Sequence, residues 1–145
     1  MLSRPIPRFS PTFSPLELRE VFRSLAPKGA GTVSEFEAAF SSYIGTKHAV
    51  MTSSARVSFY LLLEAWGLGP GDEILIPAWT YFAVPSAAMA LGVKPVFVDV
   101  GIDTYGMDPE DLARKITPRS KVIVPTHLYG LPCDMSTILD IARAH

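Results

Sequence analysis

The fold is decided by residues 48–77, which read HAVMTSSARVSFYLLLEAWGLGPGDEILIP. This stretch passes from a short apolar run, through two serines and Arg56, into an apolar segment of helical length, and it ends in a second short apolar run. An unbroken apolar run is typical of a strand that is covered on both faces of a sheet. The order strand, helix, strand therefore predicts one unit of a parallel sheet.

The same alternation continues along the rest of the chain, which predicts an α/β fold with a mainly parallel sheet and flanking helices. The four expected strands have the sequences HAVMT, EILIP, KPVFVDV and KVIVP. Helices are expected between and after them, near residues 54–66, 81–91, 109–116 and 134–145. For the third of these, Asp108 is the expected N-cap, with Pro109 at the first helical position.

The segment before residue 48 has a different pattern. Its many prolines predict an extended arm over residues 1–13, and helical spacing predicts a helix over 15–25. A capping box of Ser34 and Glu37 predicts the start of a second helix, which Gly45 ends. We therefore expect an N-terminal arm and helix over residues 1–33 and the sheet-bearing domain over 34–145.

Composition argues against several classes of protein. The 145 residues suit one domain, and a net charge of −1 gives no reason to expect nucleic acid as a partner. The longest apolar stretch, around residues 81–93, contains Pro85 and is too short to span a bilayer, so we expect no membrane association. The N-terminus lacks the apolar core of a signal peptide, and Cys133 is the only cysteine. We expect a cytoplasmic protein.

In an open parallel sheet, ligands bind where strands end and helices begin. Ser53, Ser54 and Arg56 fall at such a place. The free N–H groups of a helix start suit a phosphate, and a guanidinium would add a cation with several donors. The same residues also suit a simple serine N-cap followed by a solvated arginine. The stretch alone leaves both interpretations open.

Two further groups of residues follow the expected strands. Trp79 and Tyr81 come after EILIP, where an aromatic ring either stacks on a flat ligand or packs in the core. His127 and Tyr129 come after KVIVP, and a lone histidine at such a place is more often structural than catalytic. We assign no catalytic residue and no metal site within the chain.

Five stretches together resemble the DegT/DnrJ/EryC1/StrS family, the pyridoxal-phosphate-dependent aminotransferases that mostly act on nucleotide-linked keto sugars. In order along the chain they are FEAAFSSYIGTKHAV, GLGPGDEILIPAWTYFA, ALGVKPVFVDVGIDTYGMDPEDL, ITPRSKVIVPTHLYGLPCDM and ILDIARAH. The resemblance implies the N-terminal half of a fold type I large domain. It also implies pyridoxal 5′-phosphate as the cofactor of the full-length enzyme.

Carried over residue by residue, the resemblance implies a cofactor-binding set of Ser54, Ala55, Arg56, Val57 and Tyr81. The turn SSARV stands where the family usually has Ser-Ser-Gly-Thr and a small residue, the turn that cradles the cofactor phosphate. Arg56 replaces the threonine, which keeps the backbone donor and replaces the hydroxyl contact with a guanidinium. Tyr81 falls at the position of the aromatic ring that stacks on the pyridine.

The resemblance also implies a reaction and its partners. The full enzyme would transfer an amino group from an amino acid, with glutamate as the expected donor, to a nucleotide-linked keto sugar, and would act as a homodimer. The lysine that forms the Schiff base and the aspartate that pairs with the pyridine nitrogen have no counterpart here, because none of the chain's lysines lies in the family's lysine motif. We expect the 145 residues alone to be inactive. A non-catalytic remnant that binds a phosphorylated ligand or a partner protein, and a dehydratase of the same family, remain alternatives.

Overall fold

The computed structural model describes residues 14–24 and 30–145, so the expected extended arm over residues 1–13 lies outside the described residues. The chain divides into two compact units between Met51 and Thr52. In the described part of the chain, no helix is both long and apolar enough to cross a bilayer.

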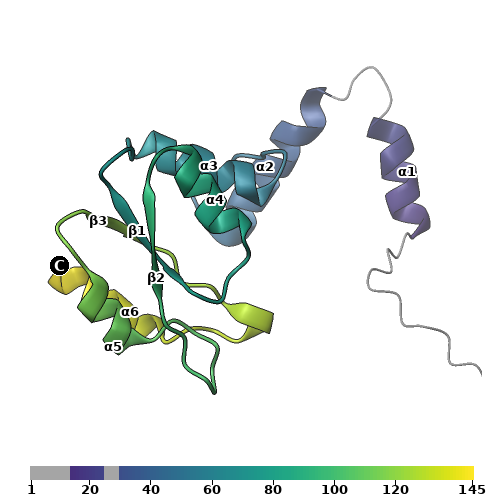
Figure 1. Cartoon of the computed structure of the whole chain (residues 1–145). Coiled ribbons are helices and arrows are strands. Elements are labelled where there is room, and N and C mark those ends of the chain that lie inside the picture. Colours follow the sequence, from purple (N-terminus) through teal and green to yellow (C-terminus); the bar gives the residue numbers. More distant parts are fainter. Residues whose placement is uncertain (1–13, 25–29) are drawn as a thin grey trace, which may run out of the picture. The chain divides into compact units, whose positions relative to one another are not determined.

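The first unit contains helices α1 (Pro15–Ser24) and α2 (Ala30–Ile44), as Figure 1 shows. A capping box does occur here, but it opens α1. The N–H of Ser14 donates to Glu17 Oε2 at 2.5 Å, and the N–H of Glu17 donates to Ser14 Oγ at 3.3 Å.

The expected capping box of Ser34 and Glu37 is wrong, because α2 begins four residues earlier and Ser34 lies inside the helix. The expected domain boundary between residues 33 and 34 also falls inside α2. Glu37 instead accepts a bond from the N–H of Met51 at 2.6 Å. Gly45 ends α2 as predicted, with a φ of +79° that suits glycine.

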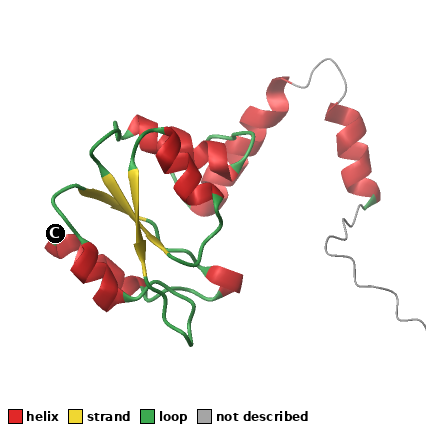
Figure 2. Cartoon of the chain, in the orientation of Figure 1, coloured by secondary structure: helices red, strands yellow, loops and turns green. Residues whose placement is uncertain are grey.

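The second unit is the α/β layer that the sequence predicts. Its three strands are β1 (Glu73–Pro77), β2 (Lys94–Val98) and β3 (Ser120–Ile123), which pair in parallel in the order β2-β1-β3. Its helices are α3 (Ala55–Ala65), α4 (Ala83–Ala90), α5 (Pro109–Lys115) and α6 (Met135–Ala144), with a short 3-10 turn η1 (Leu128–Gly130) before α6. Figure 2 shows the strands between these helices.

The expected first strand, HAVMT, is wrong: residues 48–52 form no strand. A segment is a strand only when its backbone bonds to a neighbouring strand. Both edges of β1 are taken by β2 and β3, and the structure pairs no described segment with residues 48–52. An apolar run shows that a segment can be buried, but it does not show which partner accepts its hydrogen bonds.

The core of the second unit lies on both faces of β1, whose five residues are all buried. Leu75 packs on one face with Leu112 of α5 and Ile138 of α6. Ile74 and Ile76 point to the opposite face, which α3 and α4 cover. Fully burying an aliphatic side chain of this size stabilises a fold by roughly 1.5–3 kcal/mol, so the central strand holds both layers together.

Helix α5 starts as predicted and also fixes the end of β2. The Asp108 carboxylate accepts from the N–H of Glu110 at 2.8 Å and of Asp111 at 3.3 Å, and Pro109 occupies the first turn. The Asp111 carboxylate, in turn, accepts from the N–H of Asp99 at 2.8 Å, directly after β2. That bond, joined by Lys115 beside the carboxylate, lowers the pKa of Asp111 to about 2.

Candidate functional site

The start of α3 carries free backbone donors. Ser54 is the N-cap: its backbone is extended, its Oγ accepts from the N–H of Val57 at 3.3 Å, and its carbonyl accepts from the N–H of Ser58 at 2.9 Å. In the described part of the chain, the N–H groups of Ala55 and Arg56 donate to no acceptor. Two donors and the positive end of an 11-residue helix therefore face outward at this turn.

Two hydroxyl groups that sequence reasoning missed hold this turn in place. Thr52 Oγ1 and Ser58 Oγ lie 2.6 Å apart. Both lie within hydrogen-bond distance of the Ser54 carbonyl oxygen, at 3.0 Å and 3.3 Å. Serine and threonine hydroxyls often bond to nearby backbone in this way, so their spacing around Ser54 was a usable signal. The turn is thus built before any ligand arrives.

An aromatic pair lies next to this turn. The guanidinium carbon of Arg56 is 5.7 Å from the centre of the Phe82 ring, within the range of a cation–π contact. The Phe82 and Tyr81 rings are 4.6 Å apart at their centres and tilted by 54°. Tyr81 is 60% exposed and Trp79 is 57% exposed, so neither ring packs in the core of this unit. The structure brings Arg56 and Tyr81 together through Phe82, which the sequence analysis did not name.

The segments that follow β1 and β3 are also joined. Thr80 Oγ1 and Thr126 Oγ1 lie 3.0 Å apart. His127 uses Nδ1 to accept a bond from the N–H of Cys133 at 3.1 Å, and the Cys133 thiol donates to the Thr126 carbonyl at 3.1 Å. These bonds support the structural interpretation of His127. Tyr129 is 86% exposed and has a φ of +52°.

A buried electrostatic cluster lies at the other end of the strands. Glu73 opens β1, and its carboxylate accepts from the Thr117 hydroxyl at 2.6 Å, from Lys94 at 3.2 Å and from Arg119 at 3.0 Å. The Thr117 bond, followed by those two cations, lowers the pKa of Glu73 to about 2 despite its burial. Strand direction separates this cluster from the turns after β1 and β3, so we assign it a role in stability.

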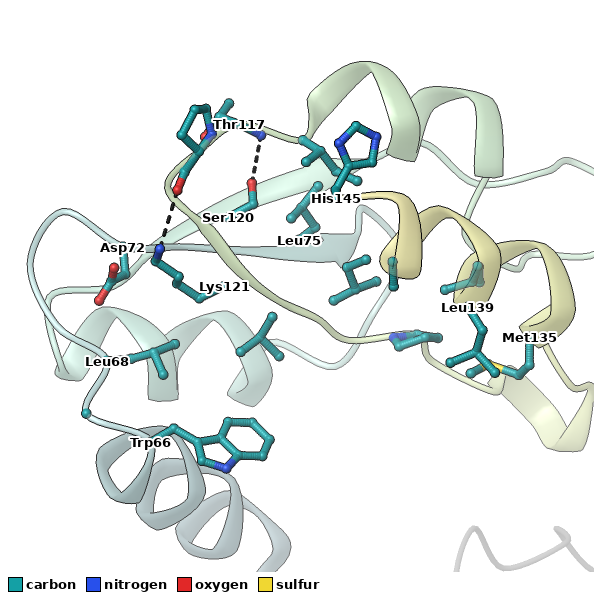
Figure 3. A pocket seen from close by; sticks show the side chains of 18 residues that line it. Trp66, Leu68, Asp72, Leu75, Thr117, Ser120, Lys121, Met135, Leu139 and His145 are labelled. Carbon is teal, nitrogen blue, oxygen red and sulfur yellow. Dashed lines mark hydrogen bonds between the residues drawn. The ribbon is translucent and has the colours of Figure 1, made fainter.

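A hollow of about 1270 Å³ also lies away from the candidate residues. It follows the edge strand β3. Figure 3 shows Trp66 and Leu68 on one side of it and Met135 and Leu139 of α6 on another. Its lining includes none of the five residues that the sequence analysis proposed for the cofactor.

The sequence and the fold of this chain are shared with known proteins. The profile of the DegT/DnrJ/EryC1/StrS aminotransferase family matches residues 15–145. The chain belongs to this family. The resemblance stated from the five sequence stretches is confirmed, and so is the α/β fold class.

Two relatives in the family indicate what such proteins do. GDP-perosamine synthase of Caulobacter vibrioides is 45% identical over 111 residues, which cover 77% of this chain and 30% of that protein. 3-Amino-5-hydroxybenzoate synthase of Amycolatopsis mediterranei is 40% identical over 114 residues, covering 79% of this chain and 29% of that protein. The chain therefore spans about a third of the length of these relatives.

A solved family member indicates the cofactor. The Streptococcus pneumoniae protein Spr1654 in its PLP-form superposes with a TM-score of 0.86 at 35% identity, over 94% of this chain and 36% of that one. Pyridoxal phosphate is thus the cofactor indicated for the family. The assignment of Ser54, Ala55, Arg56, Val57 and Tyr81 to its site in this chain stays a prediction.

Proposed function

We propose that this chain supplies the phosphate-binding and ring-stacking part of a pyridoxal-phosphate site in an aminotransferase that acts on a nucleotide-linked keto sugar. The observation that carries the proposal is the placement of Arg56, at the start of α3, beside the rings of Phe82 and Tyr81. A turn with free N–H donors alone would suit many anions. A turn with an adjacent cation and an exposed tyrosine ring suits an anionic group attached to a flat ring.

The residues present fit the phosphate end of the cofactor. The N–H groups of Ala55 and Arg56 are free to donate, and the Arg56 guanidinium adds charge-assisted donors. A phosphate monoester has a second pKa near 6, so at neutral pH it carries close to two negative charges. The helix dipole contributes typically about 0.3–1 kcal/mol, so the donors and the cation supply most of the binding.

The residues also fit the pyridine ring of the cofactor. Tyr81 comes just before Phe82, the N-cap of α4, and its side chain is mostly exposed, which leaves a ring face for the pyridine. When bound, pyridoxal phosphate supplies an electron sink for amino-group transfer. This chain's own contribution is to bind the phosphate and to set the plane of the ring.

The substrate class follows from the name of a relative. GDP-perosamine synthase carries a nucleotide-linked sugar in its name, and it is more similar to this chain than the aminohydroxybenzoate synthase is, at 45% against 40% identity. We therefore propose a nucleotide-linked keto sugar as the acceptor. Glutamate as donor, a homodimer and a cytoplasmic location are proposed from the family resemblance and the single cysteine only.

Binding of two matched ligands tests the phosphate site. Pyridoxamine 5′-phosphate and pyridoxamine differ only by the phosphate, and neither has an aldehyde that would react with surface lysines. We expect calorimetric titration of the whole chain to show tighter binding of the phosphorylated ligand. Arg56→Gln should lower that affinity by about tenfold, the effect of losing one charge-assisted contact at an exposed site.

Arg143→Gln is the matched control. Arg143 is an exposed arginine on α6 whose guanidinium pairs with Asp140 at 2.9 Å. Its loss should leave the affinity for pyridoxamine 5′-phosphate unchanged. Equal affinity of the wild-type chain for both ligands would contradict the proposed function.

A further inference from the structure

Phe82 contacts two side chains of the proposed site, because its ring lies under the Arg56 guanidinium and against the ring of Tyr81. We propose that Phe82 is a positioning residue, whose ring holds the Arg56 guanidinium beside Tyr81 so that the cation is already in place for the ligand's phosphate. This inference rests on the proposed function and adds to it a residue that touches neither the phosphate nor the pyridine ring.

The backbone of Phe82 is well suited to hold its ring still. Phe82 stands at the N-cap position of α4 with a helical backbone (φ −53°, ψ −23°). Its carbonyl accepts from the hydroxyl of Ser86 at 2.8 Å and from the N–H of Ser86 at 3.3 Å. The first turn of α4 therefore fixes the point from which the ring projects, and the ring is a stable platform for a flexible partner.

The Arg56 side chain, which the Phe82 ring contacts, is flexible. Arg56 is exposed on the first turn of α3, and an exposed arginine samples many rotamers. A cation–π contact at an exposed site favours the held position by roughly two- to fivefold over free rotamers. The conformational entropy of the arginine is thereby partly lost before binding, so a phosphate gains more from each contact.

The Phe82 side chain is not needed for packing of the core. Its side chain is 63% exposed, so the ring contributes little to the core of the second unit. Removing the ring leaves no internal cavity. A change in ligand binding on its removal would therefore reflect the contact with Arg56 rather than a collapse of the fold.

The test uses the ratio of the affinities for pyridoxamine 5′-phosphate and pyridoxamine, which isolates the phosphate contribution. Phe82→Leu should lower this ratio by about two- to fivefold. Phe82→Trp, which keeps an aromatic face for the guanidinium, should restore the ratio. Phe97→Leu, at a phenylalanine of comparable exposure on β2, is the control and should leave the ratio unchanged.

A double-mutant comparison tests whether Phe82 affects the affinity ratio through Arg56. In the Arg56→Gln background, Phe82→Leu should have no further effect on the ratio, because the side chain that Phe82 holds is gone. An equal loss of affinity for both ligands, or an undiminished loss in the Arg56→Gln background, would overturn the inference. A Phe82→Leu ratio equal to that of the wild type would overturn it too, while leaving the proposed function intact.

The contact itself can be measured without any ligand. The side-chain N–H resonance of Arg56 should be shifted by the ring current of Phe82 in the wild-type chain and should lose that shift in Phe82→Leu. An unshifted resonance in the wild type contradicts the inference whatever the ligands do. Failure of the wild type to prefer the phosphorylated ligand contradicts the proposed function, and with it the role given to Phe82.

Discussion

Glu73 shows how one buried residue joins the three strands of the second unit. It opens β1, and its carboxylate accepts bonds from Lys94 at the start of β2 and from Thr117 and Arg119 just before β3. Only 2% of the residue is exposed. A buried carboxylate is costly unless it is paired and fully bonded, and here the bonds come from β2 and from the segment that leads into β3.

This cluster predicts a loss of stability in acid. The pKa of Glu73 is about 2 in the fold, below its ordinary value of 4.5, chiefly because the Thr117 hydroxyl donates to it. The unfolded chain therefore binds more protons between these two values, and the contribution of Glu73 to stability is complete above about pH 4.5 and is lost as the pH falls toward 2. Urea unfolding at several pH values should show this fall.

Glu73→Gln should lower the unfolding midpoint at pH 7 and flatten its dependence on pH between 2 and 4.5. Glu64→Gln, at an exposed glutamate on α3, is the control and should keep the wild-type pH profile. A pH profile that is identical in Glu73→Gln and in the wild type would show that the cluster does not stabilise the fold.

At the level of elements, helix starts show what the local sequence decides. The pattern Ser-x-x-Glu occurs at Ser14–Glu17 and at Ser34–Glu37, but only the first is a capping box. Pro15 follows Ser14 directly and suits the first helical position, so the helix starts there. At the second site α2 starts upstream at Ala30, although Gly31, Thr32 and Val33 are weak helix formers. The cap pattern alone does not show where a helix begins; the residues around it also decide.

The N-cap of α3 allows stability and binding to be separated. Ser54→Ala removes the acceptor for the Val57 N–H and should lower the free energy of unfolding by about 1 kcal/mol. Ser54→Asp keeps an N-cap and should stay close to wild-type stability, while its negative charge weakens binding of pyridoxamine 5′-phosphate. Urea unfolding and calorimetry measure the two quantities. If Ser54→Asp binds the phosphorylated ligand as well as the wild type does, the phosphate does not sit at this turn.

At the level of the whole chain, the sequence predicts what is local and misses what depends on partners. The bounds of β1 are those predicted from EILIP, because both of its faces are covered and its apolar run is complete. The strand expected at residues 48–52 is wrong, since being a strand depends on a neighbour that the local sequence does not name. Phe82 was missed for the same reason: its contact with Arg56 exists only once α3 and α4 pack together.

The two-faced core predicts that the second unit unfolds as one. Leu75 and Ile76 are adjacent on β1 and fully buried in opposite layers, so losing either layer exposes the central strand. Leu75→Ala should lower the free energy of unfolding by about 2–5 kcal/mol and Ile76→Val by about 0.5–1.5 kcal/mol. Leu139→Ala, at a leucine of α6 that is 44% exposed, should cost less than Leu75→Ala. Tryptophan fluorescence and circular dichroism should report a single urea transition, and separate transitions in the wild type would show that the two layers fold independently.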